Sequence, residues 1–413
     1  MKSVILTIGD EILIGQVINT NAASIAGHLN NAGLEVARVL TVGDDLGDIV
    51  RAFAECISAF DATVVTGGLG PTHDDVTKKA VCSHFGLDLV SDAATRRNIE
   101  AFLASRGRPW TSTAEEQTLV PRGATVIPNH HGTAPGILLE PGGRHFIAMP
   151  GVPYEMEYMM EEFVVPYFRS RSGERTVLHR TLNTTGIAES TLASRIGPVG
   201  EIIPGGTLAF LPSPSGVRMR ISVVAPDRAS GEQRLRDAES RIRATAEKYI
   251  FGTDATSLEG AVGGLLTSRK LTLALAESCT GGLIADRLTN VAGSSAYLDR
   301  AVVVYSNRSK SEILGIPPEL IERHGAVSGE VAEAMARGVR TVSSTDIGIS
   351  TTGIAGPSGG SADKPVGLVW IGYSDAGRTF ALKLRLGDDR VRIKERAASA
   401  ALDLIRRTLL GID

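Results

Sequence analysis

Apolar residues alternate between strand-like and helix-like spacing along the first 170 residues. Val4 to Ile8 is a short apolar run that ends at Gly9, as a buried strand does. Helical spacing follows at 21–32, then strand patterns at 35–42 and 62–65 and helix patterns at 46–60 and 76–85. This alternation predicts a parallel sheet covered by helices on both faces, with ligands bound beyond the carboxyl ends of the strands.

A different pattern follows a polar, basic stretch at 169–175, which we interpret as a linker. Residues 207–224 hold two strand-like runs around a Pro-Ser-Pro-Ser-Gly turn, and alternate apolar positions from Val217 to Ile221 predict one buried face. A charged helix pattern then covers about 227–248. We expect a small α+β module here, with a structural role.

The alternating pattern returns after residue 255. Helix patterns cover 258–269, 283–290, 329–343 and 391–409, and strand patterns cover 271–276, 300–305, 346–352, 366–373 and 379–386. The chain is therefore predicted to be a multi-domain α/β protein. Its parts would be a parallel-sheet domain over 1–170, the α+β module over 171–254 and an α/β domain over 255–413.

Composition narrows the classes of partner. Hydrophobic residues make up 43% and charged residues 22% of the chain, as in ordinary globular proteins. A net charge of −3 without a basic stripe argues against nucleic acid or an anionic membrane as a partner. We expect a cytoplasmic protein, because no apolar run is long enough for a signal peptide or a membrane span. The three cysteines show neither a disulfide framework nor metal spacing.

A strand-to-helix turn at 277–282 carries the first candidate for chemistry. Ser278 stands on this turn, shortly before Gly281 and Gly282. A nucleophile there has its oxygen exposed, and the free N–H groups of the helix start can bind an oxyanion or a phosphate. Capping of the helix by Ser278 or Thr280 explains the same residues without any chemistry.

Two further strand ends carry residues that suit the same chemistry. Tyr305 and Lys310 follow one strand pattern, and a lysine shielded from water can act as a base toward a serine hydroxyl. A solvated surface lysine is the ordinary alternative. Thr352 and Gly353 end another strand, where small residues let backbone N–H groups approach a substrate, although a plain turn would explain them equally well.

The C-terminal segments resemble one family specifically. Its motifs are matched, in order, by Ala-Glu-Ser-Cys-Thr-Gly-Gly (276–282), Ala-Gly-Ser-Ser (292–295), Tyr-Ser-Asn (305–307), His-Gly-Ala-Val-Ser (324–328), Thr-Gly-Ile-Ala-Gly-Pro (352–357) and Lys-Pro-Val-Gly (364–367). These segments look like the nicotinamide-nucleotide amidase domain of CinA proteins. The resemblance implies hydrolysis of nicotinamide mononucleotide to nicotinate mononucleotide and ammonia, with no cofactor.

The resemblance also implies residue roles at this site. Ser278 would be the nucleophile, Lys310 the general base, and Tyr305 a proton relay or an orienting hydroxyl. The amide oxygen or the phosphate would be held by Thr280, Gly281, Gly282, Thr352 and Gly353.

Two assignments stay open. The family's Gly-Asp-Arg signature is matched one residue late, by Gly-Asp-Asp-Arg-Val-Arg at 387–392, so either Arg390 or Arg392 could clamp the phosphate. Cys279 competes with Ser278 as nucleophile, because a helix N-terminus lowers the pKa of a thiol. The family resemblance favours Ser278.

Carboxylates follow the predicted strand ends of the first domain. They form three pairs, which are Asp10 and Glu11, Asp44 and Asp45, and Asp74 and Asp75. Since the ends of parallel strands share one edge of a sheet, all six are expected to converge. Beside the glycine-rich loop at 66–72, they suit a divalent metal and a phosphorylated ligand. Capping of the following helices is the alternative for each pair.

The first domain resembles CinA proteins as well. The matching motifs are Gly-Asp-Glu-Ile-Leu (9–13), Asn-Thr-Asn (19–21), Thr-Gly-Gly-Leu-Gly-Pro-Thr (66–72), Gly-Thr-Ala-Pro-Gly (132–136) and Pro-Gly-Val-Pro-Tyr-Glu-Met (150–156). The resemblance implies a molybdopterin-binding-like fold, a homodimer, and ADP-ribose hydrolysis with Mg²⁺, Mn²⁺ or Co²⁺. The ligand would be held by Gly67, Gly68, Gly70, Thr72, Gly132 and Thr133. A pterin- or nucleotide-binding module without chemistry is the alternative.

Overall fold

The chain forms two compact units in the computed structural model, which describes residues 1–72, 75–171, 176–213 and 216–412. One unit is Met1–Leu178 with Val224–Glu232, and the other is His179–Val223 with Gln233–Asp413. The predicted metal ligand Asp74 and part of the predicted linker lie outside the described residues. In the described ranges, no helix has the length and apolarity needed to cross a membrane.

A six-stranded sheet forms the centre of the first unit. Across the sheet the order is β2 (Glu35–Val42), β1 (Lys2–Ile8), β3 (Ala62–Thr66), β8 (His145–Met149), β7 (Gly136–Leu139) and β6 (Thr125–Ile127). β2, β1, β3 and β8 pair in parallel, and β7 pairs antiparallel with both β8 and β6. The apolar run of β3 is buried at every position, as a central parallel strand requires.

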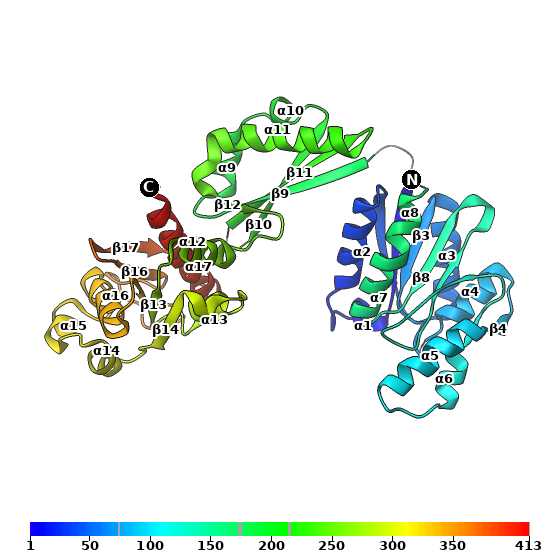
Figure 1. Cartoon of the computed structure of the whole chain (residues 1–413), viewed down its shortest axis with the longest axis horizontal. Coiled ribbons are helices and arrows are strands. Elements are labelled where there is room, and N and C mark those ends of the chain that lie inside the picture. Colours follow the sequence, from blue (N-terminus) through cyan, green and yellow to red (C-terminus); the bar gives the residue numbers. More distant parts are fainter. Residues whose placement is uncertain (73–74, 172–175, 214–215, 413) are drawn as a thin grey trace. The chain divides into compact units, whose positions relative to one another are not determined.

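Helices cover both faces of this sheet (Figure 1). On one face, Ile25 and Leu29 share an apolar cluster with Met156; on the other, Ile49 and Phe53 share a second cluster with the sheet. The helices are α1 (Asp10–Leu13), α2 (Thr20–Asn31), α3 (Leu46–Ala59), α4 (Thr77–Phe85), α5 (Ala93–Ser105), α6 (Ser112–Gln117), α7 (Pro153–Met159) and α8 (Val165–Arg169), with the π-helical turn η2 (Met160–Val164) between the last two. A small ribbon of β4 (Leu89–Ser91) and β5 (Leu119–Pro121) adjoins α5 and α6.

The middle segment forms a four-stranded sheet with helices. The strand order is β10 (Gly206–Ser213), β11 (Gly216–Ala225), β9 (Thr176–Thr184) and β12 (Ile250–Thr253), and the helices are α9 (Glu189–Ile196), α10 (Val199–Ile202) and α11 (Arg228–Ala246). Alternate residues of β11 are buried, which confirms the buried face predicted from Val217, Met219 and Ile221.

The C-terminal segment is built on a five-stranded mixed sheet. The order is β14 (Leu298–Val303), β13 (Leu273–Glu277), β15 (Ile347–Gly353), β16 (Leu368–Ser374) and β17 (Thr379–Arg385). β14, β13 and β15 pair in parallel, and β16 pairs antiparallel with both β15 and β17. Because β13 lies between two parallel neighbours, its carboxyl end meets the ends of β14 and β15 at one edge of the sheet.

Two apolar clusters hold helices against this sheet. One contains Leu266, Ile284 and Leu402, and the other Leu314 and Met335. The helices are α12 (Leu258–Arg269), α13 (Leu283–Thr289), α14 (Asn307–Leu314), α15 (Pro318–His324), α16 (Gly329–Ser343) and α17 (Arg390–Leu410). The predicted fold class is confirmed, with the difference that both α/β sheets also contain antiparallel strands.

Candidate functional sites

Ser278 stands directly after β13, an interior strand of the C-terminal sheet. Its backbone N–H donates to Thr351 O on β15 at 3.0 Å, which fixes the start of the turn. The chain then reverses into α13 through Gly281 and Gly282, whose φ angles of +63° and +95° favour glycine. Ser278 is 8% exposed, so the turn holds its hydroxyl in a nearly dry position.

The start of α13 is already occupied by a carboxylate. Glu277, which is 1% exposed, accepts hydrogen bonds from the backbone N–H groups of Gly282 (2.9 Å), Ile284 (3.2 Å) and Ala285 (2.9 Å). The expectation of free N–H groups at this helix start is therefore corrected. The N–H groups at a helix start can bind a negative charge from a ligand or from the chain itself. Here the Glu277 carboxylate supplies that charge.

Lys310 lies beside Ser278, in the first half of α14. Its Nζ is 3.2 Å from Ser278 Oγ, 2.9 Å from Val304 O and 3.4 Å from Tyr305 O. The side chain is 2% exposed, and no carboxylate in the described ranges forms an ion pair with it. Burial therefore lowers the pKa of Lys310. Nζ donates to Ser278 Oγ and to both carbonyls, so the amine and the hydroxyl are within reach of proton transfer.

Cys279 does not share the position of Ser278. The thiol is 7% exposed and belongs to the apolar cluster that contains Leu275 and Ile393. Burial raises its pKa to about 12, so the thiolate that a cysteine nucleophile needs is suppressed. The geometry thus presents the hydroxyl of Ser278, and not the thiol, to Lys310.

The predicted Tyr305 and Arg390 meet each other rather than Ser278. Tyr305 is 63% exposed, and its hydroxyl accepts a hydrogen bond from Arg390 Nη2 at 3.3 Å. Arg390 Nη1 also donates to Gly356 O at 2.6 Å, which ties the start of α17 to the loop after β15. No described hydrogen bond joins the Tyr305 hydroxyl to Ser278 or to Lys310, so only the carbonyl of Tyr305 touches the lysine.

Several predicted substrate contacts are instead bonded within the protein. Thr280 and Thr352 are fully buried; the Thr280 hydroxyl pairs with that of Thr351 at 2.7 Å, and the Thr352 hydroxyl donates to Ala326 O at 2.7 Å. Gly353 is needed for packing, since a Cβ there would lie 2.7 Å from Leu368 O. These residues form the framework behind the turn.

Arg392 and Lys394 are two further cations near the start of α17. Arg392 is exposed, and its backbone N–H is bound by the cap Asp389 at 2.8 Å, so Arg390 is the arginine that the structure brings to the loop. Lys394 was missed by the sequence analysis. Its Nζ lies 3.7 Å from the point where a Cβ on Gly281 would stand. Its spacing of four residues from Arg390, on one helix face, is the signal that could have found it.

A cavity of about 380 Å³ opens at the strand ends of the first unit. Among the predicted residues it is lined by Glu11, Gly67, Gly68, Gly70, Thr72, Thr133, Asp44 and Asp75. Gly67 has a φ of +109°, and a Cβ there would lie 2.1 Å from Ile8 O. The glycine-rich loop therefore packs directly against the end of β1, as a loop that cradles a ligand does.

The predicted acids do not converge into one cluster. Asp10 and Asp44 bind each other's backbone N–H groups, at 3.3 and 3.0 Å, whereas Asp45 caps α3 through Asp48 N at 2.9 Å. Asp75 folds back on its own loop, accepting from Gly70 N (2.8 Å) and Thr72 N (2.7 Å). No three of the described acids bring their oxygens within 4.8 Å of one another, because backbone N–H groups compete for them.

Two buried residues of this cavity were not predicted. Glu155 is 7% exposed and accepts from Asn129 Nδ2 at 2.6 Å, and a Cβ on Gly132 would overlap its carboxylate at 2.3 Å. Asn21 is 9% exposed; its Nδ2 donates to Gly151 O at 2.7 Å, and its Oδ1 has no partner among the described residues. Both residues fall within quoted motifs, but their burial became visible only in the fold.

A larger cavity, of about 1050 Å³, lies elsewhere in the second unit. It is bordered by β17, by α17 and by the start of α9, and none of the predicted site residues lines it. Its walls are mainly apolar, with Leu382, Leu384 and Leu404 among them. This cavity is thus separate from Ser278 and Lys310.

Comparison with known proteins shows which family the chain belongs to. Three family models match it in sequence order: a probable molybdopterin binding domain over residues 4–170, a damage-inducible protein CinA KH domain over 179–252 and a CinA C-terminal domain over 255–409. The CinA-like protein of Chloroherpeton thalassium is 44% identical over 418 aligned residues, which cover 99% of each chain. The chain belongs to the CinA family.

Two further CinA proteins are similar to all or part of the chain. The CinA-like protein of Salinibacter ruber is 43% identical over 99% of this chain and 100% of its own. The crystal structure of a competence/damage inducible protein from Agrobacterium tumefaciens is 41% identical and covers 37% of this chain and 93% of its own, with a TM-score of 0.36. In this CinA chain, the match to the C-terminal model includes Ser278 and Lys310, and the match to the molybdopterin-binding model includes the 380 Å³ cavity.

Proposed function

We propose that the C-terminal domain hydrolyses the carboxamide of nicotinamide mononucleotide, giving nicotinate mononucleotide and ammonia. The observation that carries the proposal is the separation of 3.2 Å between Lys310 Nζ and Ser278 Oγ in a position shielded from water. A serine with a neutral lysine base is one form of the activated hydroxyl. The substrate follows from the family motifs around these two residues.

The reaction takes place in two stages. Ser278 Oγ attacks the carboxamide carbon while its proton moves to Lys310 Nζ, which is within hydrogen-bond reach. Lys310 then returns a proton to the amide nitrogen, the C–N bond breaks, and ammonia leaves an acyl ester on Ser278. Water, deprotonated by the same amine, hydrolyses that ester, releases the nicotinate product and restores Ser278.

We assign substrate binding to the turn after β13 and to two cations on α17. Because Glu277 takes the N–H groups of α13, we assign the amide oxygen to the backbone N–H groups of Cys279 and Thr280 at the turn itself. We assign the phosphate to Arg390 and Lys394 on α17, because these are the cations that lie near Tyr305 and Gly281. Tyr305 would then orient Arg390 rather than relay a proton.

Ammonia release by the purified full-length protein tests this function. Nicotinamide mononucleotide should be hydrolysed, and nicotinamide, which has the same carboxamide but no phosphate, should react far more slowly. Equal rates on both compounds would contradict the assignment of Arg390 and Lys394 to the phosphate. No ammonia from either compound would refute the proposed amidase.

For the first domain we propose metal-dependent hydrolysis of ADP-ribose. The cavity is lined by a glycine-rich loop and by oxygen donors, which suit a hard cation such as Mg²⁺ and a pyrophosphate. The acids do not form a ready cage of three, but Mg²⁺ is commonly held by one or two carboxylates together with substrate phosphates. Asp44 and Asp75 fit this description, and a bound cation would neutralise charge on the phosphates.

The alternative for this domain is binding without chemistry. The unpartnered Asn21 Oδ1 and the buried carboxylate of Glu155 are acceptors that an amino-substituted ring or a ribose could satisfy. Release of AMP from ADP-ribose with Mg²⁺, Mn²⁺ or Co²⁺ separates the two functions. AMP formed only with metal supports hydrolysis, whereas saturable ADP-ribose binding without AMP supports the binding module.

A further inference from the structure

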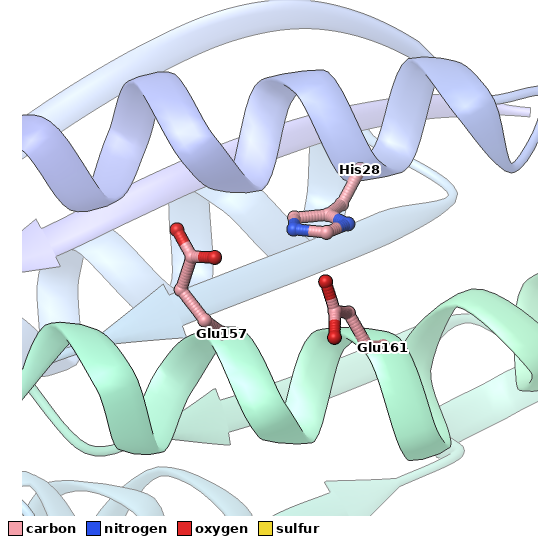
Figure 2. A group of neighbouring side chains, drawn as sticks. All are labelled: His28, Glu157 and Glu161. Atoms are coloured by element: carbon pink, nitrogen blue, oxygen red, sulfur yellow. The ribbon is translucent and has the colours of Figure 1, made fainter. Parts of the chain in front are cut away.

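Three side chains with metal-binding groups meet on the first unit, outside both sites described above. His28 belongs to α2, Glu157 to α7 and Glu161 to the π-helical turn η2. One ligand atom of each lies within 4.8 Å of the other two, which no other trio of such residues in the described ranges achieves. Figure 2 shows the imidazole of His28 facing the two carboxylates from the neighbouring helix.

The elements that carry these residues are firmly packed. On α2, Ile25 and Leu29 are fully buried beside His28, in the cluster that contains Met156 and Met160 of the opposite helix. His28 itself is half-buried, and the two glutamates are exposed. The three ligand atoms therefore extend from a rigid pair of helices, which keeps the cost of ordering them around an ion small.

The charges in this group are not balanced by the protein. Glu157 and Glu161 are four residues apart and project side by side, an arrangement of like charges that is unfavourable on a helix. His28 forms no ion pair within 4.0 Å with either glutamate in the described structure, although all three lie within 4.8 Å. The atoms are too far apart for direct bonds, and a small cation can lie between them.

The neighbouring Ser24 orients the carboxylate of Glu157. Ser24, one turn before His28 on α2, donates its hydroxyl hydrogen to Glu157 Oε1 at 2.6 Å. This bond holds the glutamate toward α2 and leaves Oε2 available. Metal-binding carboxylates are commonly held by such an outer hydrogen bond.

We propose that His28, Glu157 and Glu161 bind a divalent transition-metal ion, with Zn²⁺ as the best fit. One imidazole nitrogen and two carboxylate oxygens suit borderline cations better than Mg²⁺, and three protein ligands leave a position for water. Zinc–ligand distances of about 2.0–2.2 Å place tetrahedral ligands roughly 3.4 Å apart, so the exposed glutamates close by about 1 Å. The ion links α2 to α7 and thereby stabilises the first unit.

Zinc titration of the full-length, chelator-treated protein tests this proposal. Isothermal calorimetry compares the wild type with His28→Ala, Glu161→Gln and Ser24→Ala, and circular dichroism confirms that each variant is folded. We expect His28→Ala and Glu161→Gln to weaken one zinc site by about 100-fold or more, and Ser24→Ala to weaken it by roughly 10-fold. Zinc should raise the melting temperature of the wild type but not that of His28→Ala.

Two controls separate this site from other zinc binding. His130→Ala removes an exposed imidazole of the same unit, and Asp75→Asn alters the cavity proposed for ADP-ribose. Both should retain the zinc site and its effect on melting. The proposal is overturned if His28→Ala binds zinc as the wild type does, or if only Asp75→Asn abolishes binding. Neither result would bear on ADP-ribose hydrolysis, which is measured separately as AMP release.

Discussion

The two candidate sites of this chain differ in how complete they are before any ligand binds. At the C-terminal site, Lys310 is buried, its amine is held by two carbonyls, and Ser278 Oγ is already 3.2 Å away. At the N-terminal cavity, Asp44 and Asp75 accept hydrogen bonds from backbone N–H groups and do not form a cluster. The chain alone assembles the first site, whereas the second needs a ligand or cation to draw its acids together.

The largest expected effect is the loss of ammonia release when the nucleophile of the C-terminal site is removed. Ser278→Ala removes the attacking oxygen and should reduce ammonia release by roughly 10⁴-fold or more. Cys279→Ala removes a buried thiol whose pKa is about 12, so most activity should remain. Steady-state kinetics of both variants give the comparison. If Cys279→Ala were the inactive variant, the assignment of the nucleophile would be wrong.

The role of Lys310 as the base predicts how kcat/KM depends on pH. Lys310 must be neutral to accept the proton, and burial lowers its pKa, so kcat/KM should rise with pH and level off below the ordinary lysine value near 10.5. Lys310→Arg keeps a cation that cannot be deprotonated and should lose roughly 10²- to 10⁴-fold in rate at every pH. A pH–rate profile of Lys310→Arg that rises as in the wild type would exclude Lys310 as the base.

The lowered pKa of Lys310 also affects the stability of the fold. Because the pKa of Lys310 is lower in the folded state than in the unfolded chain, the unfolded state binds more protons between the two values. The free energy of unfolding therefore gains a rising contribution over that pH range, up to the unfolded value near 10.5. Lys310→Met should remove this contribution, as chemical denaturation at several pH values can measure.

Metal removal tests the incomplete site. EDTA should abolish AMP release from ADP-ribose, because the phosphates lose the cation that neutralises their charge, and Asp75→Asn should reduce it by roughly 10²-fold, because that cation loses a carboxylate ligand. Ammonia release should persist in EDTA, since the proposed amide chemistry uses only Ser278, Lys310 and backbone groups. Loss of amidase activity in EDTA with unchanged folding would contradict the division of labour between the two sites.

The sequence predicted the layout of the sites better than their local bonding. Buried apolar runs such as Leu273–Glu277 identify interior strands, and parallel strands place their carboxyl ends together, whereas the pairing of Ser278 with Lys310 was implied by the family resemblance. The alternation of apolar and polar residues along β11 could likewise be recognised in the sequence. These features are local or repetitive, and a linear pattern encodes them directly.

Competition for backbone N–H groups could not be predicted in the same way. Glu277 precedes the predicted nucleophile, and its carboxylate caps α13 and takes the anion site expected there. Asp45 and Asp75 are drawn from the predicted metal cluster for the same reason. Whether a short acidic side chain binds the backbone or a ligand depends on geometry within one turn, which sequence spacing does not resolve.

The smallest expected effect concerns the independence of the C-terminal domain. Among the described residues, every hydrogen-bond partner of Ser278 and Lys310 lies within 255–412, and some 160 residues can bury about two-thirds of the surface of the unfolded chain. A fragment of residues 255–413 should therefore fold and hydrolyse nicotinamide mononucleotide within about tenfold of the full chain, a change of ~1.4 kcal/mol in the barrier. Circular dichroism and ammonia release measure both properties.

The fragment should nevertheless be less stable than a longer one, for a reason found on α17. Arg406 is 2% exposed and donates to Lys248 O (2.7 Å) and Ile250 O (3.4 Å) of the middle segment, besides its pair with Asp403. Removal of those carbonyls should cost about 1–3 kcal/mol of unfolding free energy relative to a 179–413 fragment, which keeps them. Because these bonds stabilise the last helix and not the Ser278 turn, the two fragments should differ in melting temperature more than in rate. A short fragment that is folded but inactive beside an active long one would show that the middle segment completes the amidase site.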